Sequence, residues 1–252
     1  AKWALSEDSL SSIEAVAEKL APSDRLNLYR HLFSGRDFDL YKEKDNWREQ
    51  WKLLEQRRQK AIQEILAQGG VDSILRFVEV VESPGQVGRS LGCIADAEID
   101  AVLLPGYLGS PDRKLSSLIS NYVWSRYGAS NWSWVDGLDR SGWNTERIGC
   151  FLSYLPFTSE TWNRAAEWLG DNQGYYWLHA NVNPYQADNE LVVAVGKLLE
   201  YGRPHAAIDC LNRMREEEQP INVKQCVEAL LAALSSSEPA HSANAYEIVE
   251  LI

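Results

Sequence analysis

The sequence predicts an all-α protein made of stacked antiparallel helical hairpins that form an α-solenoid, with about ten or eleven helices. Apolar residues recur three and four positions apart through most of the chain, which is the spacing of one helical face. Gly, Pro, Ser and Asn interrupt this spacing at short intervals, as they do where one helix ends and the next begins. Strand candidates are few, so we expect no sheet.

The N-terminal quarter predicts one short helix and one long helix. Pro22 and Ser23 mark a helix start before LNLYRHLF. A longer helix is predicted over residues 45–68, roughly 36 Å at about 1.5 Å per residue. Its apolar spacing is interrupted at Arg58, and the two glycines that follow residue 68 are expected to end it.

ILRFVEVV, residues 74–81, is the best strand candidate because it is rich in β-branched residues. The same residues fit one face of a helix, with Ile74, Phe77, Val78 and Val81 inward. A lone strand would have no partner, so we predict a helix here.

GRSLG, residues 88–92, has the G-x-S-x-G spacing of a hydrolase nucleophile elbow, with Ser90 in the position of the nucleophile. An elbow needs a strand before the serine, whereas the breaker sequence ESPGQV precedes it here. Residues 85–94 instead predict a short helix with Val87, Leu91 and Ile94 on one face. Gly88 and Gly92 would then let a neighbouring helix approach closely, and we expect no catalytic serine.

The C-terminal half predicts further helices with clear boundaries. Pro156 and Thr158 precede a helix that closes at Gly170, and Asp188 is a predicted N-cap. The turn YGRP, in which Gly202 can end one helix, predicts an αα-hairpin. NVKQCVEALLAAL is the strongest helix prediction, because Asn222 can cap it and its apolar residues share one face, namely Val223, Cys226, Val227, Leu230, Leu231 and Leu234.

Composition predicts a soluble globular chain. Hydrophobic residues make up 45% and charged residues 24% of the 252 residues. No apolar run is long enough to span a membrane and no leader pattern opens the chain, so we expect a cytoplasmic location and no membrane partner. Met214 is the single methionine and the chain ends within the apolar pattern AYEIVELI. We therefore expect residues 1–252 to be a single helical-repeat domain, a fragment of a longer chain.

Several classes of chemistry lack their sequence signatures. The chain has no G-x-x-x-x-G-K, no G-x-G-x-x-G and no H-E-x-x-H motif, so we expect no cofactor and no metal. A net charge of −11 opposes binding to a phosphate backbone, so nucleic acid is not an expected partner. One enzymatic alternative stays open, a helical-toroid carbohydrate enzyme with paired acids in a cleft lined by tryptophan.

The ten tryptophans allow two interpretations. Their rings can fill the spaces between helices, or they can form a contact surface for a protein or peptide. The surface interpretation concerns residues 131–144 and 172–185, because both mix aromatics with Asn and Gly and have a weak helical period. The candidate partner-binding residues in these segments are Trp132, Trp134, Trp143, Tyr175, Tyr176, Trp177 and Tyr185.

Residues 70–92, 155–177 and 198–211 resemble helical-repeat regions, similar to tetratricopeptide or HEAT repeats, of large bacterial multidomain proteins. Some of those proteins resemble signal-transducing ATPases. The resemblance implies a sensing or scaffolding part of a larger bacterial protein. It implies no catalytic residue here, because the nucleotide-binding domain is not in this sequence. The predicted function is therefore noncatalytic binding of a protein or peptide.

Overall fold

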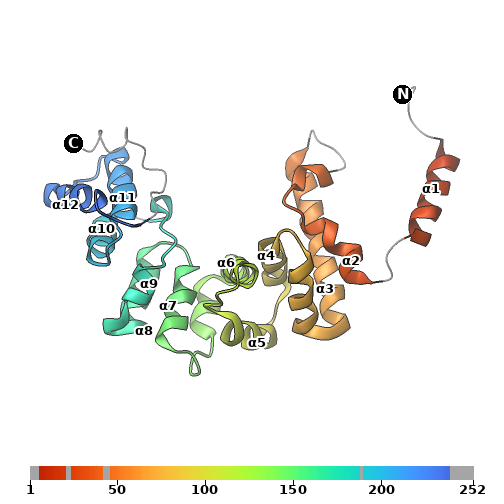
Figure 1. The fold of residues 1–252 in the computed structure, drawn as a ribbon, viewed down its shortest axis with the longest axis horizontal. Helices are drawn as coiled ribbons and strands as arrows, with labels where there is room; N and C mark the ends of the chain where they lie inside the picture. The colour runs from red at the N-terminus through yellow and green to blue at the C-terminus, as the bar shows by residue number, and fades with distance from the viewer. Residues whose placement is uncertain (1–5, 21–23, 42–45, 188–189, 239–252) are drawn as a thin grey trace. The chain divides into compact units, whose positions relative to one another are not determined.

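The computed structural model describes residues 6–20, 24–41, 46–187 and 190–238. Within these ranges the chain forms twelve α-helices and four short 3-10 helices, η1–η4, and no strand (Figure 1). The all-α prediction is thus confirmed. None of the helices in this part of the chain combines the length and hydropathy needed to cross a membrane. The helix starts predicted at Pro22, Ser23 and Asp188, and the apolar pattern of residues 245–252, lie outside the described residues.

The packing separates the chain into two compact units. Unit 1 comprises Ala1–Asp100 and Asp112–Ser125, and unit 2 comprises Ala101–Pro111 and Arg126–Ile252. The first half of the chain contains α1 (Glu7–Leu20), α2 (Arg25–Tyr29), η1 (Arg30–Phe33), η2 (Asp37–Leu40), α3 (Trp47–Val80), α4 (Pro84–Ile94), α5 (Ala97–Tyr107) and α6 (Arg113–Gly137). The second half contains α7 (Thr145–Ser153), α8 (Ser159–Leu169), η3 (Gly170–Asn172), α9 (Gly174–Trp177), η4 (Pro184–Gln186), α10 (Leu191–Glu200), α11 (Pro204–Glu216) and α12 (Val223–Ala233).

Helix α3 contains the long helix predicted over residues 45–68 and continues to Val80. Gly69 and Gly70 depart from helical dihedral angles inside it, and Gly70 has a φ of 61°. These glycines therefore interrupt the helix at the predicted place. After them, residues 74–80 are helical, as expected for a segment with no strand to pair with.

Arg58, which interrupts the apolar spacing of α3, is fully buried. Its Nε donates to the Leu32 carbonyl at 2.7 Å, and its guanidinium pairs with Asp37 at 2.6 Å and with Glu55 at 2.7 Å. A buried charge is tolerated only when it is paired and hydrogen-bonded. Arg58 therefore holds η1 and η2 against α3.

Helix α4 crosses α6 at Gly88. A Cβ at this position would lie 2.0 Å from the carbonyl oxygen of Leu118, so only glycine fits the approach of the two backbones. The close approach predicted for Gly88 is confirmed.

In unit 2, helices that are neighbours in sequence pack on one another, as α7 does on α8, α10 on α11 and α11 on α12. The α10–α11 connection is the predicted hairpin turn. Gly202 has a φ of 70°, and the amide of Arg203 donates to the Leu198 carbonyl at 2.8 Å, which closes the end of α10.

Arg203 and Glu238 join three parts of unit 2. Arg203 donates to the carbonyls of Trp177 and Ala180 at 3.1 and 2.8 Å, and its Nε donates to Glu238 at 2.9 Å. Glu238 also accepts from the backbone amide of His205 at 2.8 Å, at the start of α11. A carboxylate at this end of a helix is stabilised by the unpaired amides there.

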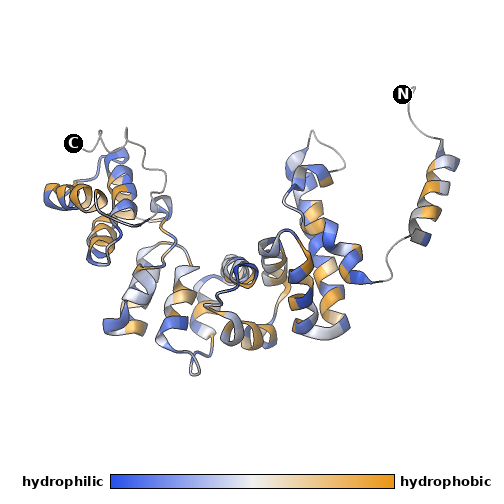
Figure 2. Cartoon of the chain, in the orientation of Figure 1, coloured by the Kyte–Doolittle hydropathy of each residue, from blue (hydrophilic) through white to orange (hydrophobic). Residues whose placement is uncertain are grey.

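Helix α12 is confirmed, and Asn222 caps it by accepting from the amides of Lys224 and Gln225. Its orientation is less expected. Of the six apolar residues that share the predicted face, only Cys226 is buried, whereas Leu231 is 63% exposed. The small residues Cys226 and Ala229 face the unit, and hydrophobic residues run along the helix in Figure 2.

Candidate functional site

Four of the seven predicted partner-binding residues lie in the core of unit 2, namely Trp134, Trp143, Tyr176 and Trp177, which are between 1% and 9% exposed. Trp134 and Trp143 both pack on the ring of Phe151, with centroids 5.8 and 5.3 Å away. The structure therefore places these four side chains inside the unit and not on a surface that a partner could contact. Their placement agrees with the alternative interpretation, in which the rings fill the spaces between helices.

Trp132, Tyr175 and Tyr185 remain accessible. Trp132 is half-buried, Tyr175 is 40% exposed and Tyr185 is 69% exposed. They lie on α6, α9 and η4, and no ring contact joins any two of them in the described part of the chain. The Tyr185 ring instead lies under the guanidinium of Arg213, 4.5 Å from its centroid.

Trp132 is the centre of a cluster formed by α6 and α8. The guanidinium carbon of Arg164 lies 3.9 Å from the Trp132 ring centroid. The same guanidinium donates to both carboxylate oxygens of Asp136, at 2.9 and 2.7 Å. Tyr127 packs edge-on against Trp132 with ring centroids 5.1 Å apart. A cation over an indole face and a two-pronged carboxylate pair both favour arginine at position 164.

A second arginine lies on a second tryptophan nearby, with Arg140 in the segment that follows α6 and Trp168 on α8. The guanidinium of Arg140 lies 3.8 Å from the Trp168 ring centroid and donates to the Val135 carbonyl at 2.8 Å. The same carbonyl, in the last turn of α6, also accepts from the Leu138 amide at 3.5 Å. We call the combined set the arginine–tryptophan surface; its members are Tyr127, Trp132, Asp136, Arg140, Arg164 and Trp168.

Electrostatics keep the ion pair of this surface charged. The hydrogen bond from Arg164 lowers the pKa of the Asp136 carboxyl below its ordinary value, although desolvation acts the other way. Burial raises the pKa of the Tyr127 hydroxyl, and the charge of Glu160 adds to this effect. At neutral pH Tyr127 is therefore a neutral hydroxyl beside a charged pair, and the surface offers both apolar rings and hydrogen-bonding groups.

Of the six members of this surface, only Trp132 was a predicted site residue. The spacing held a signal for three of the others, because Asp136 is one helical turn from Trp132 and Arg164 is one turn from Trp168. Each pair therefore shares a helix face. The sequence does not show that the two faces meet.

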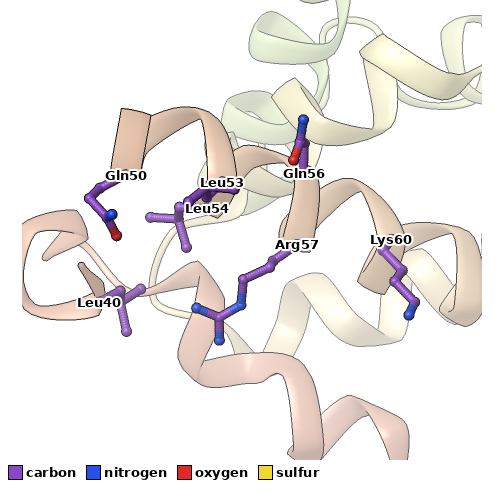
Figure 3. Close-up of a pocket in the computed structure, with 7 residues that line it drawn as sticks. All are labelled: Leu40, Gln50, Leu53, Leu54, Gln56, Arg57 and Lys60. Carbon is purple, nitrogen blue, oxygen red and sulfur yellow. The ribbon is translucent and has the colours of Figure 1, made fainter. Parts of the chain in front are cut away.

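A separate cavity of about 280 Å³ lies beside α3 in unit 1 and is shown in Figure 3; we call it the α3 pocket. Its apolar part comes from Leu40, at the end of η2, and from Leu53 and Leu54. Its polar part comes from Gln50, Gln56, Arg57 and Lys60. None of these residues was a predicted site residue.

The serine of the G-x-S-x-G motif lies inside a helix. Ser90 is in α4, which begins at Pro84 and ends at Ile94, so the predicted helix is confirmed. Its side chain is fully buried, and its Oγ has no hydrogen-bond partner among the described residues. A nucleophile must be reachable by its substrate, so this hydroxyl is unsuited to that role.

Cysteine and metal chemistry also find little support in the described ranges. Burial raises the pKa of the Cys150 and Cys210 thiols, which keeps them protonated at neutral pH. No group of three His, Cys, Asp or Glu side chains within those ranges could hold a metal ion.

A second cavity, of about 680 Å³, is lined by Arg30, His31, Ser34, Arg36, Asp39, Val80 and Glu82. Neither this cavity nor the α3 pocket has the tryptophan lining expected of a carbohydrate enzyme.

Comparison of the chain with models of protein families, with curated proteins and with solved structures gives no match. The resemblance to bacterial helical-repeat regions therefore stays a prediction from the sequence.

Proposed function

We propose that the chain is a noncatalytic protein- or peptide-binding module of a larger bacterial protein, in which stacked helical hairpins form a solenoid that serves scaffolding or sensing. The arginine–tryptophan surface is its proposed contact site. The sequential packing of α10, α11 and α12 supports the solenoid, because a repeat array brings consecutive helices together.

The observation that carries this proposal is the half-buried Trp132 ring held beneath the guanidinium of Arg164. Trp, Tyr and Arg are the residue types that dominate binding energy at protein interfaces. Side chains held in place before binding lose little conformational entropy on contact. The Asp136 pair fixes Arg164 in this way, so the surface is ordered before a partner arrives.

A quantitative pull-down tests the proposal, with the 252-residue chain as bait and a bacterial lysate as the source of partners. We expect Trp132→Ala and Trp168→Ala to reduce the recovered partner at least about tenfold, the loss typical of an interface anchor. Trp124→Ala is the matched control, because Trp124 also lies on α6 and is 46% exposed but does not belong to the surface. Recovery that is equal for wild type and Trp132→Ala would remove the site assignment.

A further inference from the structure

The α3 pocket combines an apolar floor with a basic edge. Leu54 is buried beneath the pocket, while Leu53 is 45% exposed at its wall. In Figure 3, Arg57 and Lys60 extend from the same side of α3, one turn apart, and Leu40 lies across from the helix. Both cationic side chains are exposed to solvent. The pocket thus places two positive charges next to a hydrophobic hollow.

These two cations have no carboxylate partner in the part of the chain that the structure describes. No carboxylate of the described residues lines the pocket, and Glu55, the carboxylate closest to Arg57 in sequence, pairs with the buried Arg58. In a chain whose net charge is −11, the two cations give this pocket a positively charged edge. Their charge is therefore available for an acidic partner.

The dimensions favour a peptide side chain. At about 280 Å³ the pocket is slightly smaller than most small-molecule sites, and it is open to solvent. A large aliphatic side chain fits such a hollow, whereas an aromatic base would find no ring in the lining to stack on. The exposed amide of Gln56 can hydrogen-bond a peptide backbone beside the aliphatic residue.

We propose that the α3 pocket binds an acidic peptide segment of a partner protein, which inserts one large aliphatic side chain between Leu40, Leu53 and Leu54. Carboxylates next to that residue pair with Arg57 and Lys60. The proposal is independent of the function proposed above, since the pocket lies in unit 1 and the arginine–tryptophan surface lies in unit 2.

The first test is selection from a displayed library of random peptides on the immobilised 252-residue chain. We expect enrichment of sequences in which Leu, Ile or Met is flanked by Asp or Glu. The same selection on the double variant Arg57→Glu/Lys60→Glu should not enrich them. Enrichment of sequences without acidic residues, or an unchanged result with the double variant, would overturn the proposal.

The second test measures the Kd of a fluorescent, capped peptide, Asp-Glu-Leu-Leu-Glu-Asp, by anisotropy. We expect Arg57→Glu/Lys60→Glu to raise the Kd at least about tenfold, because charge pairs across an interface are replaced by like charges. Leu53→Asp should raise it about fivefold by adding a charge to the apolar wall. All three positions are exposed, so circular dichroism should show unchanged folding.

Two controls separate the pocket from general electrostatics. Lys52→Glu removes a positive charge from the same helix outside the pocket, and it should change the Kd by less than about twofold. Trp132→Ala should leave it unchanged, so loss of the arginine–tryptophan surface and loss of the pocket are distinguishable. An equal loss with Lys52→Glu, or equal binding of a peptide with both leucines replaced by serine, would show that no specific pocket is used.

Discussion

Trp177 and Trp132 belong to the same unit and to similar aromatic segments, yet one is buried in the core and the other is partly exposed. Trp177 is 1% exposed and packs among Phe157, Trp162 and Tyr176, with ring centroids 6.3, 6.0 and 5.0 Å away. Trp132 is half-buried and lies under a guanidinium. The residues around each tryptophan explain the difference. Aromatic rings surround Trp177, which belongs to the core, whereas a guanidinium covers one face of Trp132 and keeps that face near water.

The largest effect on stability is expected for substitution of the core tryptophan, Trp177. Trp177→Ala should lower the free energy of unfolding by about 3–5 kcal/mol, because it leaves a cavity where a large ring was packed. The indole Nε1 of Trp177 has no hydrogen-bond partner among the described residues. Trp177→Phe should therefore cost clearly less than Trp177→Ala, because it removes no hydrogen bond seen among these residues and leaves a smaller cavity. Urea unfolding measures both; a cost below about 1 kcal/mol for the alanine variant would contradict the core assignment.

A second large effect is expected where α9 meets α7. A Cβ added at Gly149 would lie 2.5 Å from the Cβ of Tyr175 and 2.7 Å from its carbonyl carbon. Gly149→Ala should destabilise the fold by about 1–3 kcal/mol, because α7 and α9 must move apart. Gly128→Ala is the control, since a Cβ there would meet nothing within 4 Å beyond its own stretch of helix, and alanine favours a helix. Thermal unfolding that ranks the two variants equally would show that the contact is not tight.

The ion pair beside Trp132, between Arg164 and Asp136, should make a contribution to stability that depends on pH. Arg164 lowers the pKa of Asp136, so the pair stabilises the fold above about pH 4, where an unfolded aspartate is charged. This contribution is lost as the pH falls through the lower pKa of the folded state. Because the Asp136 side chain is 51% exposed, we expect at most about 1 kcal/mol.

Asp136→Asn tests this expectation. Its cost in the free energy of unfolding should be present near neutral pH and should shrink as the pH falls below the native pKa of Asp136. A carboxyl titration followed by NMR would give that pKa directly. A value at or above that of a free aspartate would mean that the Arg164 pair does not persist in solution.

The smallest effect is expected on α12. Leu231 is 63% exposed, so Leu231→Glu should change the free energy of unfolding by no more than about 0.5 kcal/mol. Ala229→Glu, at a buried position on the same helix, should instead cost several times more. Comparable costs for the two variants, measured by urea unfolding, would indicate that both faces of α12 are covered.

The sequence was informative where a residue acts through its own backbone. Gly202 predicted the turn between α10 and α11, Asn222 predicted the start of α12, and Gly88 predicted a close crossing. Each of these effects is local, because a left-handed angle, a cap or a missing Cβ depends on a few neighbouring residues.

The site was harder to predict because it depends on which faces meet. The apolar stripe of α12 suggested its buried side, yet the small residues Cys226 and Ala229 are inside, where they allow a close approach to the unit. In the same way, residues 131–144 included Trp132 but gave no indication of Arg164, which reaches it from α8. A contact between residues that are far apart in the chain produces no recurring pattern in a single sequence, so the sequence alone does not reveal it.

The crossing at Gly88 limits how unit 1 can deform. A carbonyl of α6 occupies the place where a side chain would stand, so axial slip of α4 would bring a residue with a Cβ against the Leu118 backbone. Rotation about this point is resisted as well, because the Ser125 hydroxyl of α6 donates to the Arg89 carbonyl at 2.8 Å and Asn121 lies close against Gly85. We therefore expect α4 and α6 to move together, so that a displacement of one helix is passed directly to the other.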